Sequence, residues 1–231
     1  MAGAGQPRSV AWAHGLALSR GRLLRMSAPI VILTGGMGMG KSTACSVFEE
    51  LGIEVVDADL LTRQLTQSGG QAMPAIEAVF GGSVIRPDGS LDRDAMRAMA
   101  FESPQQRVQL ESILHPLVQQ AAQEALSRTR GPYCVYAVPL WAEVYGSDRP
   151  SWVWRVISLD TSPDVQLQRI AARGAPPPDE LAAMLGRQAR RKDRKAVADV
   201  VIGNDGSLAE LSAQIHALHK TLLSQSPSKQ A

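Results

Sequence analysis

The sequence predicts an α/β fold built on a five-stranded parallel sheet. Short apolar runs rich in valine and isoleucine alternate with segments whose apolar residues recur at helical spacing. The domain opens with a strand at 30–34, a helix at 41–51 and a second strand at 53–56. This β-α-β order places both strands in one parallel sheet. Of the 231 residues, 45% are hydrophobic and 20% charged, a balance that supplies a substantial core.

The remaining elements follow from the same periodicities and from proline and glycine positions. The predicted strands are residues 30–34, 53–56, 133–138, 153–159 and 200–202. The predicted helices are residues 41–51, 71–80, 92–101, 104–115 and 117–126, one that starts at 161–164, and one that Ser207 caps. Prolines 104 and 163 suit a first helical turn. Pro116 is expected to break or kink the helix at His115.

Both ends of the chain are expected to lie outside the folded domain, which is predicted to span 28–222. Residues 1–25 contain four arginines and no acidic residue, a composition that fits an organellar transit peptide. A second interpretation is that translation starts at Met26, because Met26-Ser27-Ala28-Pro29 leads directly into the first strand. We favour a leader over 1–27 that is disordered or not native. Residues 223–231 are expected to form a disordered tail.

Composition excludes several classes of protein. The formal net charge is only +2 and aromatic residues make up 4%, which argues against a nucleic-acid-binding protein. Two cysteines do not make a disulfide framework. No uninterrupted apolar run reaches the roughly 18 residues of a membrane-spanning helix. We therefore expect a cytoplasmic monomer or weak oligomer that binds neither nucleic acid nor membrane.

A glycine-rich loop between the first strand and the first helix carries the strongest chemical signal. Gly35, Gly40, Lys41 and Ser42 match the phosphate-loop pattern G-x-x-x-x-G-K-[ST] in full. Glycine lets backbone N–H groups converge on a polyphosphate, and the following helix adds its N-terminal dipole. The pattern predicts Lys41 on the β- and γ-phosphates and Ser42 on Mg²⁺. The predicted nucleotide-binding residues here are Gly36, Met37, Gly38, Met39, Gly40, Lys41, Ser42 and Thr43, the two methionines contributing only their backbone.

Other features narrow the class of nucleotide-binding protein. A GTPase normally carries an N-K-x-D motif, which is absent, and no apolar strand ends in the paired acids of a motor ATPase. An arginine-rich stretch at 169–195 instead favours a phosphoryl-transfer enzyme with a closing lid, which neutralises charge and excludes water. The alternative is a solvated basic helix face or a weak nucleic-acid patch. The stretch contains Arg169, Arg173, Arg187, Arg190, Arg191, Lys192, Arg194 and Lys195.

Asp57 and Asp59 follow the second strand, at the sheet edge where ligands bind in parallel α/β proteins. A carboxylate there can orient or deprotonate an acceptor hydroxyl, or hold a water molecule on magnesium. An acid before Leu60 can also cap a helix. We expect one of the two to cap and the other to do chemistry.

Several segments together resemble the dephospho-coenzyme A kinase family. They are L-T-G-G-M-G-M-G-K-S-T at 33–43, L-G-I-E-V-V-D-A-D at 51–59, L-H-P-L at 114–117, V-P-L-W-A-E at 138–143, R-I-A-A-R at 169–173, Q-x-x-R at 188–191 and A-D-V-V-I-G-N-D-G at 198–206. The phosphate loop is generic, but this order of segments is specific. The resemblance implies a three-layer P-loop kinase fold and phosphorylation of the ribose 3′-hydroxyl of dephospho-CoA by ATP with Mg²⁺, the last step of coenzyme A synthesis.

The resemblance also implies roles for individual residues. Asp59 would be the base that deprotonates the acceptor hydroxyl, and Arg173, or else Arg169, would reach the phosphates from the lid. Asn204 and Gly206 would lie near the adenine of ATP. The helices at 68–130 would bind the acceptor, and the implied substrate-binding residues are Asp57, Asp59, His115, Pro139 and Leu140.

Some alternatives stay open at this point. His115 either contacts the acceptor or shapes its pocket through the His-Pro pair. Gly174 stands where the family often has an acid, and Trp141 replaces a common leucine. The rival functions are another small-molecule P-loop kinase and a regulatory nucleotide-binding protein.

Overall fold

The computed structural model describes residues 28–227, so the predicted leader at 1–27 and the tail residues 228–231 lie outside the described part. The described residues form two compact units. The larger unit comprises 28–60 and 122–227, and the smaller comprises 61–121.

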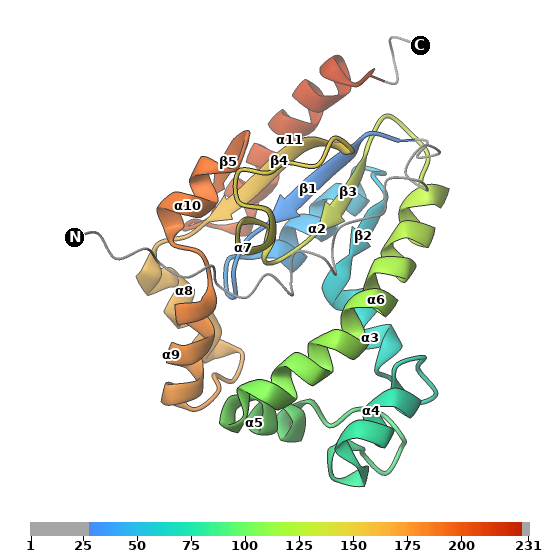
Figure 1. The fold of residues 1–231 in the computed structure, drawn as a ribbon. Coiled ribbons are helices and arrows are strands. Elements are labelled where there is room, and N and C mark those ends of the chain that lie inside the picture. Colours follow the sequence, from blue (N-terminus) through green and yellow to red (C-terminus); the bar gives the residue numbers. More distant parts are fainter. Residues whose placement is uncertain (1–27, 228–231) are drawn as a thin grey trace, which may run out of the picture. The chain divides into compact units, whose positions relative to one another are not determined.

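The larger unit contains the five-stranded sheet (Figure 1). Its strands are β1 (Ile30–Thr34), β2 (Val55–Asp57), β3 (Cys134–Ala137), β4 (Val153–Asp160) and β5 (Val200–Gly203). Their order is β2-β3-β1-β4-β5 and every neighbouring pair is parallel. The predicted parallel α/β sheet is therefore confirmed. Strand β1 lies at its centre, between β3 and β4.

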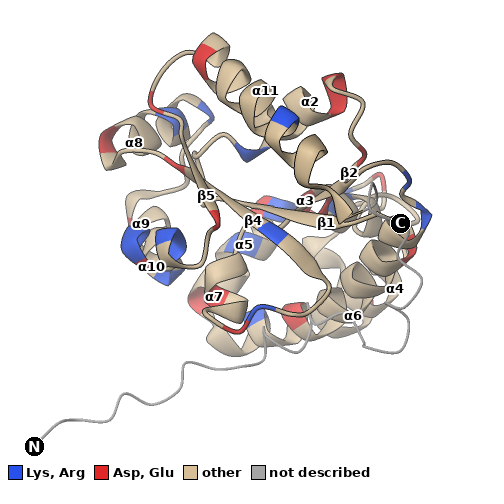
Figure 2. Ribbon diagram, turned by 90° about the horizontal axis from the view of Figure 1, so that it is seen from above, with Lys and Arg blue, Asp and Glu red and all other residues tan. Residues whose placement is uncertain are grey.

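Helices cover both faces of this sheet, which gives the larger unit three layers (Figure 2). The helices of the larger unit that flank or follow the sheet are α2 (Lys41–Glu50), α7 (Trp141–Tyr145), α8 (Pro163–Ala172), α9 (Pro178–Arg187), α10 (Arg191–Ala196) and α11 (Leu208–Gln225). Helices α2 and α11 lie on one face, and α7 and α10 on the other. Val31 and Leu33 of β1 pack in the core with Phe48 of α2 and Ile215 of α11. Side chains alternate along a strand, so Ile32 points to the opposite face, where it is also fully buried.

The smaller unit is helical, as the sequence predicts for this region. It contains most of α3 (Ala58–Leu65), then α4 (Met73–Phe80), a 3₁₀ turn η2 (Gly82–Val84), α5 (Arg93–Glu102) and the first part of α6 (Pro104–Arg128). Ile76, Val84 and Met96 are buried apolar residues of this unit. The Asp92 carboxylate caps α5 by accepting hydrogen bonds from the N–H groups of Asp94 and Ala95.

Two predicted boundaries are corrected by the structure. Strand β2 starts at Val55 rather than at residue 53, because the N–H of Ile53 bonds to the carbonyl of Phe48 in the turn that ends α2. Helix α6 runs unbroken from Pro104 to Arg128 with Pro116 inside it, so a helix break there is wrong. Proline removes a single backbone donor, and the hydrogen-bonding pattern resumes on either side of it.

The chain end is also ordered further than predicted. Helix α11 continues through Gln225, so residues 223–225 belong to the helix and not to a tail. Leu222 is buried in the core, and the Ser226 hydroxyl, also buried, donates a hydrogen bond to the carbonyl of Pro132. These two anchors hold the end of the helix to the larger unit.

Candidate active site

The carboxyl ends of the parallel strands bring the predicted site residues of the larger unit to one edge of the sheet. The phosphate loop follows β1, Asp57 ends β2, and Asp160 lies at the end of β4. Asn204 directly follows β5. Ligands of open parallel sheets bind at this edge.

Three glycines of the loop are constrained by backbone conformation, by close approach of a side chain, or by both. Gly38 and Gly40 have φ angles of 77° and 88°, in the left-handed region that disfavours a side chain. A Cβ on Gly40 would lie 2.2 Å from Nδ2 of Asn204, and one on Gly36 would lie 2.2 Å from Oε1 of Gln188. The loop is thus bounded by two side-chain amides from distant segments.

The carbonyl groups of the two methionines are held by side chains outside the loop. Nε2 of Gln166 donates to the Met37 carbonyl at 2.7 Å, and Nδ2 of Asn204 donates to the Met39 carbonyl at 2.9 Å. In a trans peptide the following N–H points the opposite way, so the N–H groups of Gly38 and Gly40 face away from these amides. The Met39 side chain is fully buried, and its sulfur accepts the N–H of Gly36 at 3.1 Å. No pattern in the sequence indicates this last contact.

Lys41 meets both acids that follow β2. Its Nζ lies 2.8 Å from Oδ2 of Asp59 and 3.8 Å from Oδ1 of Asp57. Burial lowers the pKa of Lys41, but the charges of Asp59 and Asp57 outweigh it and raise the pKa above the model-compound value of 10.5. The ammonium group is therefore fully charged at neutral pH.

The two acids have different local roles. Oδ1 of Asp57 accepts the N–H of Asp59 at 2.8 Å and that of Leu60 at 3.4 Å, which caps α3. Asp59 lies in the first turn of α3 with its side chain 56% exposed and bound to Lys41. We expected one of these two acids to cap a helix, and Asp57 is the one that does.

The two arginines predicted to contact phosphates differ in their surroundings. Nη1 of Arg169 donates to the carbonyl of Asn204 at 2.7 Å, and Nη2 to that of Gly206 at 3.5 Å. Arg173 is exposed at the end of α8, and within residues 28–227 its guanidinium has no hydrogen bond or ion pair. Arg169 therefore fixes the segment after β5, while Arg173 projects into solvent.

The other predicted residues are distributed over both units. Pro139 and Leu140 follow β3, where the Pro139 carbonyl accepts a hydrogen bond from Oγ1 of Thr34 at 3.2 Å. His115 lies on the part of α6 that belongs to the smaller unit, and burial lowers its pKa below 6.5. Ser42 and Thr43 occupy the first turn of α2 beside Lys41.

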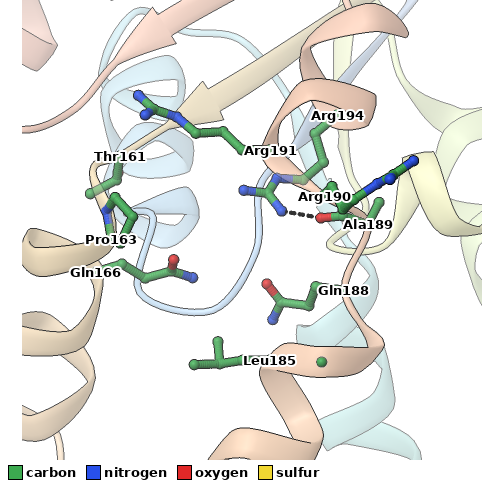
Figure 3. Close-up of a pocket in the computed structure, with 10 residues that line it drawn as sticks. Thr161, Pro163, Gln166, Leu185, Gln188, Ala189, Arg190, Arg191 and Arg194 are labelled. Carbon is green, nitrogen blue, oxygen red and sulfur yellow. Dashed lines mark hydrogen bonds between the residues drawn. The ribbon is translucent and has the colours of Figure 1, made fainter.

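A cavity of about 340 Å³ lies between α8, α9 and α10 in the larger unit (Figure 3). The residues that line it include Thr161, Gln166, Gln188, Arg190, Arg191 and Arg194. Lysines and arginines gather on α10 (Figure 2). The sequence pointed to this site through the arginine-rich stretch at 169–195 and the Q-x-x-R segment at 188–191.

Asp160 anchors the basic helix α10 beside this cavity, and sequence reasoning missed it. Its two carboxylate oxygens accept hydrogen bonds from Arg191 at 2.6 and 2.7 Å, and Lys195 lies 2.8 Å away. The hydrogen bonds from Arg191 hold the pKa of Asp160 below its usual 3.8, against the opposing effect of burial. An aspartate directly before the Thr161-Ser162-Pro163 helix start was the available signal.

The model of the family described as dephospho-CoA kinase matches residues 29–210. The chain belongs to the dephospho-CoA kinase family. A dephospho-CoA kinase of Thiobacillus denitrificans is 46% identical over 191 residues, 83% of this chain and 94% of that protein. One of Dechloromonas aromatica is 42% identical over 204 residues, 88% and 98% of the two chains.

Solved structures agree on the fold. A crystal structure from Thermus thermophilus superposes with a TM-score of 0.69 at 26% identity, covering 85% of this chain and 98% of that one. A shikimate kinase of Acinetobacter baumannii gives a TM-score of 0.50 at 18% identity, covering 89% of this chain and 99% of that one, which supports the P-loop kinase fold alone. The dephospho-CoA kinase family phosphorylates dephospho-CoA to CoA with ATP, in the last step of CoA biosynthesis. The predicted family, fold class and enzyme class are therefore confirmed.

Proposed function

We propose that the sheet edge formed by the phosphate loop, Asp59 and the α8–α10 region is the active site of this kinase. The observation that carries the proposal is the 2.8 Å contact between Nζ of Lys41 and Oδ2 of Asp59. It joins the phosphate-binding cation and a partly exposed carboxylate at one point. A donor phosphate and an acceptor hydroxyl must meet at such a point.

The loop binds the phosphates of ATP. Its N–H groups at Gly38 and Gly40 face away from the side chains that hold the neighbouring carbonyls. The N-terminus of α2 adds further unpaired donors and the positive end of the helix dipole. Lys41, kept charged by its carboxylate neighbours, neutralises the β- and γ-phosphates.

Asp59 acts as the base toward the ribose 3′-hydroxyl of dephospho-CoA. The hydroxyl oxygen forms a bond to the γ-phosphorus, its proton passes to the Asp59 carboxylate, and the bond to the β-phosphate oxygen breaks to release ADP. The Asp57 cap fixes the first turn of α3 and therefore the place of Asp59. The substrate contacts assigned to His115, Pro139, Leu140 and the 68–130 helices stay predictions.

Arg173 is the arginine that contacts the transferred phosphoryl group. Its guanidinium has no competing partner within residues 28–227, whereas Arg169 is engaged by two carbonyls at the segment after β5. Arg169 instead supports Asn204 and Gly206, the residues that we place near the adenine of ATP.

The residues present also fit a magnesium ion bound together with ATP. Mg²⁺ in kinase sites takes one or two protein ligands and completes its shell with phosphates and water. Ser42 is exposed in the first turn of α2, directly after Lys41. The Ser42 hydroxyl would hold the ion, which would neutralise charge on the β- and γ-phosphates.

Over 28–227, no helix is both long and apolar enough to cross a bilayer. The cytoplasmic location, the monomeric or weakly oligomeric state and the lack of nucleic-acid binding stay predictions.

An acceptor scan tests the proposed function. Purified protein with Mg-ATP is given dephospho-CoA, nucleoside monophosphates or shikimate, and products are separated by mass. We expect CoA and ADP in equal amounts from dephospho-CoA and no phosphorylation of the other acceptors. Folded protein that forms no CoA would refute the proposal, and turnover of another acceptor would reassign the substrate.

A further inference from the structure

We propose that Glu143 is a positioning residue for ATP binding. It holds the linker 188–190, between α9 and α10, so that Gln188 stays against the phosphate loop. The inference rests on the proposed binding of ATP phosphates at that loop. Glu143 is the acidic residue of the V-P-L-W-A-E segment, and it takes no part in the proposed phosphoryl transfer.

Glu143 reaches the linker from a distant element. It lies on α7, which follows β3, and its Oε1 accepts the backbone N–H of Ala189 at 2.6 Å. The other carboxylate oxygen is buried and has no hydrogen-bond partner within the described residues. The carboxylate therefore directs its one hydrogen bond at the main chain of the linker.

Arg194 holds the same residue from the other side. This arginine is only 7% exposed, and its Nη1 donates to the carbonyl of Ala189 (Figure 3). Burial lowers the pKa of Arg194, and the negative charges of Glu143 and Asp160 counteract that effect. Both polar groups of Ala189 are thus fixed by charged side chains, one from α7 and one from α10.

The clamped linker carries side chains to the loop and the cavity. Oε1 of Gln188 would lie 2.2 Å from a Cβ on Gly36, so the Gln188 side chain lies directly against the loop backbone. Across the cavity Gln188 faces Gln166, which holds the Met37 carbonyl (Figure 3). A linker released from Glu143 would withdraw Gln188 from the loop.

Stability alone does not explain a carboxylate at this position. Burying a charged group costs free energy, and an apolar side chain of similar size is often equally good or better for the fold. An apolar replacement cannot supply an acceptor for the main-chain N–H of Ala189. Glu143→Met should therefore keep the fold and lose the clamp, and Glu143→Gln should keep an acceptor oxygen for Ala189.

The test combines steady-state kinetics with hydrogen–deuterium exchange of the full chain, using Glu49→Met at an exposed site on α2 as the matched control. Loss of a charged acceptor predicts that Glu143→Met raises the KM for ATP about tenfold. The KM for dephospho-CoA should stay within about twofold, and exchange should accelerate at 186–192 but not in the sheet. Glu143→Gln and Glu49→Met should stay within about threefold of wild type.

Wild-type values for Glu143→Met, both in the KM for ATP and in exchange at 186–192, would overturn the proposal. If Glu143→Met also loosens the sheet, the Glu143→Gln variant decides the question. A folded Glu143→Gln variant with a tenfold higher KM for ATP would refute the hydrogen-bond role. A wild-type KM for ATP in that variant would support it. Hydrogen–deuterium exchange does not require turnover. If the wild-type protein forms no CoA, the proposed function is refuted, and exchange at 186–192 still tests whether Glu143 holds the linker.

Discussion

In the loop at 35–43 we propose that the main chain binds the nucleotide, whereas in the stretch at 169–195 the side chains make the contacts that matter. The loop needs small residues, because Gly38 and Gly40 have positive φ angles and Gln188 and Asn204 leave no room for a Cβ at two positions. The arginines of the second region are long and flexible. Their roles depend on which partner each of them reaches.

Four arginines of the second region illustrate this dependence. Arg169 binds carbonyls after β5, Arg191 binds Asp160, and Arg194 binds the linker carbonyl of Ala189. Arg173 is exposed at the end of α8. Three of these four arginines therefore hold other parts of the chain in place, and Arg173 is the one whose charge is available to a ligand.

The largest effect is expected for substitution of Asp59, because it should abolish proton abstraction and leave ATP binding by the loop amides intact. Asp59→Asn removes the proposed base, which should lower kcat by about 100- to 10,000-fold. ATP binding measured by calorimetry should stay within a few-fold, because the loop amides are untouched. A regulatory nucleotide-binding protein would instead tolerate the change, and unaltered kcat would contradict the assignment.

A pair of glycines tests whether close approach, rather than conformation alone, sets the loop. Gly40 and Gly174 have φ angles of 88° and 81°, but only a Cβ on Gly40 meets another atom within 4 Å. Gly40→Ala should displace the loop and lower kcat/KM for ATP about 100-fold. Gly174→Ala should cost about 1–2 kcal/mol of stability through backbone strain and leave kinetics near wild type. Equal kinetic losses in both variants would remove the distinction.

Matched Arg→Lys substitutions should separate the two kinds of arginine. Arg173→Lys keeps the charge but loses the planar fork, so kcat should fall about tenfold while the melting temperature stays the same. Arg191→Lys breaks the two-point contact with Asp160 and should lower the melting temperature by a few degrees. A lower melting temperature for Arg173→Lys than for Arg191→Lys would contradict this division of roles.

The smallest effect is expected on the pH dependence of the free energy of unfolding, through Asp160, which holds α10. The pKa of Asp160 is lowered below 3.8 in the folded protein, so its charged form stabilises the fold above about pH 4. This contribution is lost as pH falls through the folded-state pKa. Urea unfolding of wild type and Asp160→Asn should therefore show a stability gap that is constant at pH 5–7 and closes below pH 4. A gap that does not narrow as the pH falls below 4 would assign the effect to packing.

Sequence by itself determined the features that depend on near neighbours in the chain. The glycine-lysine-serine spacing defines the phosphate loop, Ser207 and Glu210 form the capping box of α11, and alternating apolar runs define the strands. Each of these is encoded within a few residues, where backbone geometry links spacing to structure. Helix α6 shows the limit of local rules, because it continues through Pro116.

Tertiary structure alone decided how the site residues divide their tasks. Local pattern leaves open which of Asp57 and Asp59 caps a helix, and the start of α3 assigns the cap to Asp57, while Lys41 lies closer to Asp59. The engagement of Arg169 by the segment after β5, and of the linker by Glu143, joins residues 35 and 46 positions apart. Contacts at such separations are set by how strands order in the sheet, and no local spacing in the sequence records that order.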